Sequence, residues 1–157
     1  MSGAAYRIID EPQPGALAQI AVNPFWPLLA FMLGGLWCAW PWFVINAFAL
    51  GSPTRVRETG FAVAGFVGIF AIAFLMGWLM LKGVVGADRV KYAMMVVTLW
   101  KLGISYWLYE LQSRSFGLYQ YFGGVVRSGL AVVVLAAFAK SGVLGLSSSG
   151  LWKLLVS

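Results

Sequence analysis

The stretch GFAVAGFVGIFAIAFLMGWLML, residues 60–81, contains no charged residue and decides the fold class of this chain. A helix rises 1.5 Å per residue, so about 20 residues cross the ~30 Å hydrocarbon core of a bilayer. Apolar residues do not alternate with polar ones here, as they would in a strand of a membrane barrel. Three further stretches resemble it, and we predict membrane spans over residues 24–50, 60–81, 90–111 and 123–144.

The composition points to the same class. Of the 157 residues, 61% are hydrophobic and 10% are charged, whereas soluble domains carry about 25% charged residues. Because so few charges cannot cover a globule in water, the sequence predicts an all-α integral membrane protein with a bundle of four transmembrane helices. We expect residues 1–22 to be an N-terminal extramembrane segment, residues 23–146 to be the four-helix domain, and residues 147–157 to be a short interfacial tail.

Pro41 lies near the centre of the first stretch. A proline inside a helix removes one hydrogen bond and pushes against the carbonyl four residues earlier, here that of Trp37. We expect a first helix kinked at Pro41, because membrane helices tolerate proline when neighbours compensate. The alternative is a broken or re-entrant helix that lines a cavity. Trp37, Trp40 and Trp42 form an aromatic cluster around this point, which either fills space or walls such a cavity.

Small residues recur at intervals of four in the second stretch, and this spacing places them on one face of a helix. They are Gly60, Ala64 and Gly68, followed by Ala73 and Gly77. Small side chains let a second helix approach closely. The pattern predicts a helix-packing face, used either within the bundle or against another chain.

Lys101 lies near the middle of the third stretch, between Thr98 and Ser105, which are about one helical turn away on either side. A lysine at the centre of a bilayer costs about 2.5–3.5 kcal/mol. Three outcomes are physically reasonable: a neutral amine, hydrogen bonds to carbonyls freed near Pro41, or an anion supplied by a lipid, a solute or a partner. The alternative without a function is a side chain that extends to water at a deep indentation. We predict an intramembrane polar site formed by Lys101, Thr98 and Ser105.

Acidic residues are missing from the interior of the predicted spans. Glu58 and Asp88 fall in connections, and Glu110 lies at the end of the third span. We therefore expect any counter-charge for Lys101 to come from outside the chain, from another membrane-protein chain or from an anionic ligand.

The residue inventory argues against most enzymes. The chain has no histidine and a single cysteine, Cys38, within the first predicted span. A Ser-His-Asp or Cys-His arrangement is therefore impossible, and a dense metal cluster or histidine-ligated haem is not expected. We predict no catalytic, cofactor-binding or metal-binding residues, and no cofactor.

Eleven lysine and arginine residues face five acidic ones, for a net charge of +6, but they are scattered singly. This pattern is typical of topology signals and contacts with anionic lipid, not of a nucleic-acid interface. Six cations against four favour cytoplasmic termini, in a membrane of the bacterial inner (plasma) type.

These observations predict a small non-enzymatic polytopic membrane protein. We expect it to act as a subunit, regulator or assembly partner of a membrane complex, or as a homo-oligomer. The alternative is a small transporter or channel for an ion or anionic solute, with Lys101 as its gate and Pro41 as its hinge. An enzyme acting on lipid is a more distant alternative.

Overall fold

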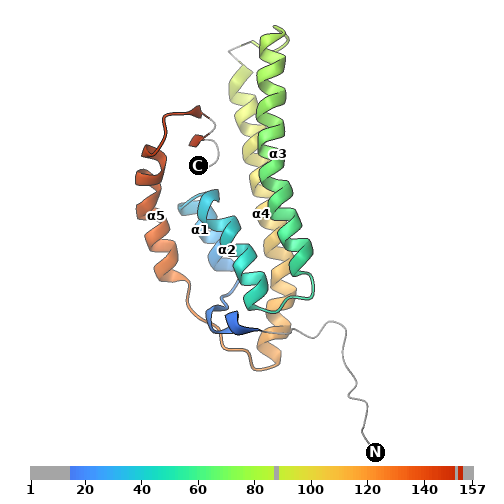
Figure 1. Ribbon diagram of the computed structural model, residues 1–157, viewed down its shortest axis with the longest axis vertical. Helices are drawn as coiled ribbons and strands as arrows, with labels where there is room; N and C mark the ends of the chain where they lie inside the picture. The colour runs from blue at the N-terminus through green and yellow to red at the C-terminus, as the bar shows by residue number, and fades with distance from the viewer. Residues whose placement is uncertain (1–14, 87–88, 151, 154–157) are drawn as a thin grey trace, which may run out of the picture.

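The computed structural model describes residues 15–86, 89–150 and 152–153, and in these ranges the chain is helical without named strands (Figure 1). A 3₁₀-helix, η1, precedes five α-helices. The elements are η1 (Ala16–Ile20), α1 (Phe25–Leu33), α2 (Leu36–Ala49), α3 (Arg55–Leu81), α4 (Val90–Tyr121) and α5 (Leu130–Gly145). The predicted all-helical class is confirmed.

Among the described helices, α3 alone is both long and apolar enough to cross a membrane, with 27 residues and a mean hydropathy of 2.2. The helices α2 and α5 are apolar but shorter, and α4 is longer but more polar. Helix length and composition therefore do not confirm a bundle of four transmembrane helices.

The first predicted span is not one helix kinked at Pro41, and that prediction is wrong. The helix α1 ends at Leu33, and the chain reverses at Gly34 and Gly35 before α2 begins. Gly35 has a φ of 101°, which favours glycine. A Cβ at Gly34 would lie 2.8 Å from Cβ of Ala136. Because glycine has no side chain, α5 can pack closely against this turn. The helix α2 continues through Pro41. The proline removes one backbone hydrogen bond, but the helix is not interrupted.

The hairpin formed by α1 and α2 lies at the centre of the molecule, with α5 on one side and the pair α3–α4 on the other (Figure 1). Leu36, Trp40 and Phe43 of α2 are fully buried, and they form a core with Ile69 of α3 and Leu108 of α4. The helix α2 supplies four of the nine residues of this core, more than any other helix. The helices α3 and α4 also pack directly against each other, and α5 packs against α1.

Three other boundaries differ from the predicted spans by several residues. The helix α3 begins at Arg55 instead of Gly60. The helix α4 continues past Leu111 to Tyr121, and α5 begins at Leu130 instead of near residue 123. Before α5 the chain is extended, and the Arg127 amide donates a 2.8 Å hydrogen bond to the carbonyl of Ala21. The connection from α4 to α5 therefore lies beside the end of η1.

The predicted terminal segments are described in part. Residues 1–14 of the segment 1–22 lie outside the described residues, as do residue 151 and residues 154–157 of the tail 147–157. Within the tail, the Trp152 indole donates a 2.7 Å hydrogen bond to the carbonyl of Val143. This contact folds the described part of the tail back onto α5.

Candidate functional site: a buried polar seam

Polar side chains in the interior follow one line through the helices, which we call the polar seam. Its members are the buried polar and charged residues of the described chain: Asn46, Ser52, Glu58, Lys101, Ser105, Gln112 and Ser115. Four of the seven lie on α4 at intervals of three to seven residues, a spacing that keeps them on one helix face. This face of α4 points toward the hairpin, whereas most large apolar side chains of α4 point outward.

The first contact of the seam joins α2 to α4. The indole N–H of Trp40 donates a 2.9 Å hydrogen bond to Oγ of Ser105. The Trp40 ring is fully buried and packs edge-on against Phe66 at 4.8 Å between centroids. A Cβ on Gly65 would lie 2.4 Å from this indole, so α3 approaches closely because residue 65 has no side chain. Trp40 therefore joins α2, α3 and α4 in one contact.

Two buried amides form the middle of the seam. Asn46 donates through Nδ2 to Oε1 of Gln112 at 3.0 Å, and Gln112 donates through Nε2 to the carbonyl of Phe43 at 2.6 Å. The backbone amide of Val22 donates to Oδ1 of Asn46 at 2.9 Å. Each amide oxygen and nitrogen of the pair thus has a partner, as buried polar groups require. The pair clamps α2 to α4 and to the segment after η1.

At its other end the seam closes around Glu58, in the first turn of α3. Ser52 and Thr54 donate through their hydroxyls to Oε1 of Glu58 at 2.6 and 2.7 Å. The Ser52 and Ser115 hydroxyls lie 3.0 Å apart, which links the cluster to α4. The other carboxylate oxygen of Glu58, Oε2, is buried without a hydrogen-bond partner. Helix dipoles favour a negative charge in a first turn by about 0.3–1 kcal/mol.

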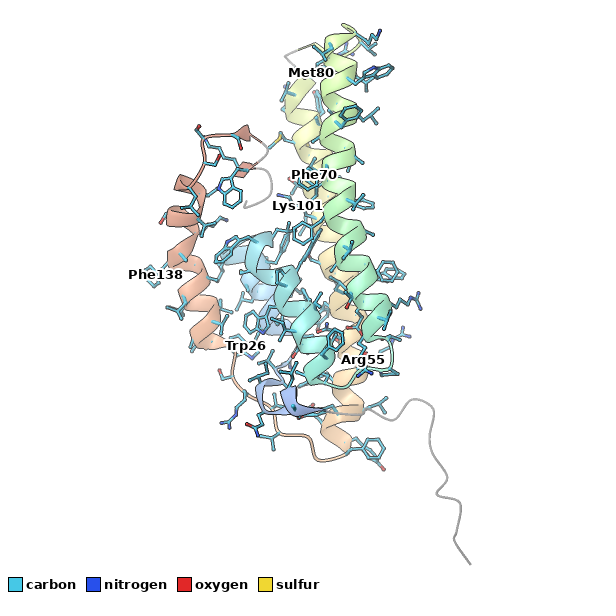
Figure 2. The ribbon with its side chains drawn as sticks, viewed as in Figure 1. Trp26, Arg55, Phe70, Met80, Lys101 and Phe138 are labelled. Carbon is cyan, nitrogen blue, oxygen red and sulfur yellow. The ribbon has the colours of Figure 1, made fainter. Side chains whose placement is uncertain are left out.

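Lys101 lies toward the opposite end of the seam, and its side chain is 5% exposed. Figure 2 places it midway along α4, on the side that faces the hairpin. Fourteen residues separate it from Ser115, about 21 Å along the helix. This distance is too long for Glu58 to form an ion pair with it.

Only two of the three residues of the predicted intramembrane polar site lie together in the interior. Lys101 and Ser105 are both buried in the seam, but Thr98 is exposed and donates to the carbonyl of Met94 in its own helix at 2.9 Å. Thr98 therefore lies on the outer surface of α4 and not beside Lys101 in the interior.

The predicted aromatic cluster is divided between three environments. Trp40 is in the core, and Trp37 donates through its indole to the carbonyl of Gly34 at 2.8 Å. Pro41 and Trp42 line a groove of about 560 Å³ between α2, η1 and the start of α5, together with Arg127. The tryptophans therefore do not surround a common cavity.

The predicted helix-packing face of α3 is mostly outside the molecule. Gly60, Ala64 and Gly77 are exposed, and a Cβ on either glycine would have no neighbour within 4 Å. Ala73 is partly exposed, while a Cβ on Gly68 would lie 2.5 Å from the Trp100 indole. Close packing inside the chain thus uses Gly68 and Gly65, and the sequence pattern had missed Gly65.

Apart from Lys101 and Ser105, the members of the seam were missed by sequence reasoning. Gln112 and Ser115 lie beyond residue 111, where the third span was predicted to end, and Glu58 was assigned to a connection. Gln112 and Ser115 follow Ser105 by seven and ten residues, which are sums of three- and four-residue helical steps, and this spacing was the available signal. This spacing can be recognised only if the helix is known to continue to Tyr121.

The seam contains oxygen and nitrogen ligands but no transition-metal cluster: in the described ranges, no three His, Cys, Asp or Glu side chains gather. Oxygen atoms gather around Glu58, where two carboxylate oxygens and the hydroxyls of Ser52 and Thr54 meet. Comparison with known proteins adds no assignment, because no protein family, curated protein or solved structure matches this chain.

Proposed function

We propose that this chain is an integral membrane protein that works by association with a second membrane helix, from a partner or from another copy of itself. In this arrangement α3, α4 and α5 cross the bilayer, and the α1–α2 hairpin enters it without crossing. The four predicted apolar stretches then all lie in lipid, although only three of them span it.

The observation that carries the proposal is the inverted distribution of polarity. All seven members of the polar seam are buried, while many large apolar side chains are exposed. Examples are Leu81 at 89%, Phe138 at 80%, Phe74 at 78% and Leu99 at 67% exposed. Figure 2 shows Phe138 pointing away from the rest of the molecule. Exposed apolar area costs about 25 cal/mol per Å² in water, whereas lipid tails solvate it freely.

The helix α3 supports the same conclusion. Only 11% of its apolar window is buried, so α3 is not the core helix of a water-soluble domain. The re-entrant hairpin is also compatible with lipid, because Gly34 and Gly35 at its turn are buried by protein. Non-helical backbone is tolerated at membrane depth where protein covers it.

A re-entrant hairpin changes the expected topology. An odd number of crossings puts η1 and the end of α5 on opposite sides of the membrane, and these ends are far apart in Figure 1. The sequence-based expectation of two cytoplasmic termini assumed four crossings. An inner membrane of the bacterial type remains a prediction.

The proposed contact surface is the outer side of α3. Gly60 and Ala64 lie on the opposite side of this helix from Gly65 and Ile69, which face the core. Farther along, Phe74, Gly77 and Trp78 line an open apolar groove of about 720 Å³. Small residues beside large apolar ones offer a partner helix close backbone contact, the main source of affinity between helices in lipid.

Association through this face is tested by the double substitution Gly60→Leu and Ala64→Leu. We expect the folded chain to keep its stability, because both residues are exposed. We expect its association in lipid to weaken at least tenfold, because the new side chains hold the partner helix away. Energy transfer between labelled copies in liposomes measures self-association, and native mass spectrometry after gentle extraction measures partners.

The matched control is Gly142→Leu, at an exposed glycine of α5 with an equally open environment. It should leave association unchanged. Equal association of both variants and the parent chain would contradict the contact surface. Release of the chain from membranes by an alkaline carbonate wash would contradict the membrane assignment itself.

Transport of an anionic solute remains a second candidate, favoured by the buried Lys101. A cation in a membrane interior attracts anions, and such residues commonly mark transport pathways. Lys101→Met removes this cation. Under this candidate, chloride or phosphate flux into liposomes should fall at least tenfold while association is unchanged.

Lys91→Met, at an exposed lysine in the first turn of α4, is the control and should leave flux unchanged. Parent chain that conducts no better than protein-free liposomes would exclude transport of these anions. If the parent chain shows no flux and Lys101→Met weakens association, the result would favour a role of Lys101 in contact with a partner.

A further inference from the structure

Hydrogen bonds within the described chain satisfy only one of the two carboxylate oxygens of Glu58. Its side chain is 0% exposed, and its Oε1 atom accepts two hydrogen bonds. Its Oε2 atom accepts none and is buried. An unsatisfied buried oxygen is rare in proteins, and a buried carboxylate without a positive partner is more costly still.

The nearby arginines are directed elsewhere. Arg55 lies over the ring of Phe48 at 5.7 Å, and Arg57 lies over the ring of Phe61 at 5.5 Å. Both arginines are exposed, and neither forms a hydrogen bond with Oε2. Lys101 lies about 21 Å along α4 from Ser115, which belongs to the Glu58 cluster. The positive charge that Glu58 lacks is therefore not supplied by these side chains.

The dipole of α3 supplies only part of it. Glu58 lies in the first turn of this helix, whose positive end favours a carboxylate by about 0.3–1 kcal/mol. The dipole gives Oε2 no hydrogen-bond donor, and that oxygen stays buried without a partner.

We propose that Glu58, Ser52, Thr54 and Ser115 form a binding site for a monovalent cation of the sodium type. The ligands are all oxygen atoms, which hard cations prefer. One carboxylate among neutral hydroxyls balances a single positive charge, whereas a divalent ion would leave a buried excess. Ser52 and Thr54 already donate hydrogen bonds to Oε1, so the ion would contact Oε2 and the lone pairs of the hydroxyl oxygens. A site made of a few closely packed oxygens favours Na⁺ or Li⁺ over the larger K⁺. The bound ion would join α2, α3 and α4 at this end.

Thermal unfolding in different salts tests the site in the full-length chain. The chain is unfolded in detergent at constant ionic strength, with NaCl, LiCl or KCl replacing choline chloride. We expect the midpoint to rise with Na⁺ in a saturable way, by about 5–10 °C at a hundred times the dissociation constant. Potassium should give a smaller shift at equal concentration.

Glu58→Gln keeps the shape of the side chain and removes its charge, so the sodium-dependent shift should disappear. Glu110→Gln, at an exposed glutamate of α4, is the matched control and should keep it. If Glu58→Gln does not fold, Ser115→Ala provides the test, because removing one neutral ligand should weaken sodium binding at least threefold.

The site would be excluded by identical midpoints of the parent chain in sodium, potassium and choline. It would also be excluded if the sodium shift persisted in Glu58→Gln or was unchanged in Ser115→Ala, because the ion would then act elsewhere. A midpoint that changes with pH but not with sodium would assign the position to a proton. The inference does not depend on association through α3, which these measurements leave untouched.

Discussion

Replacing Trp40 by alanine is expected to lower the free energy of unfolding by about 3–5 kcal/mol, the range for large aromatic truncations in packed cores. The indole is fully buried between α2, α3 and α4, and it packs against Phe66 and Gly65. Its removal leaves a cavity and takes the donor away from Ser105. Denaturant titration of the detergent-solubilised chain, followed by circular dichroism, measures the loss.

Two variants separate the causes of this effect. Trp40→Phe keeps a ring but removes the N–H, so we expect a smaller loss of about 1–2 kcal/mol. Trp107→Ala removes a tryptophan from α4 that is 50% exposed, and it should cost about 1 kcal/mol or less. Equal losses for Trp40→Ala and Trp107→Ala would contradict the central role of Trp40.

Replacing Gln112 by leucine is expected to cost about 2–3 kcal/mol, although the side chains are similar in size. The substitution leaves Nδ2 of Asn46 buried without its acceptor and removes the donor to the Phe43 carbonyl. The effect should be visible as a lower unfolding midpoint in denaturant with an unchanged slope.

The matched control is Gln120→Leu, at an exposed glutamine of the same helix, which should change stability by less than about 0.5 kcal/mol. The double variant Gln112→Leu with Asn46→Leu should lose less than the sum of the two single losses, because the contact between the two amides is counted in both. A double variant less stable than the sum of the single losses would contradict a paired clamp.

Much of the fold was predictable because its causes are local. Continuous apolar runs predicted helices, and α3 has its last residue where the second stretch was predicted to end. The first stretch was predicted to end at residue 50, and α2 ends at Ala49, shortly before Gly51 with its φ of 63°. The charge inventory identified Lys101 as an unusual residue, and it is buried.

The reversal at Gly34 and Gly35 was not predictable in the same way. Glycine is frequent in membrane helices, so Pro41 carried more weight in the prediction than these two glycines. What decides the outcome is the contact of Gly34 with Ala136, which lies about a hundred residues later in the chain. Such a contact exists only after α5 packs on the hairpin.

The sequence by itself determined that the chain is helical, where its apolar segments lie, and that a lysine lies among them. These properties depend on hydropathy and on nearest neighbours along the chain. The tertiary structure alone decided that the first segment folds back, that Asn46 meets Gln112 across 66 positions, and that Glu58 is buried. Which face of a helix becomes interior depends on the helices packed against it, and no local pattern contains that information.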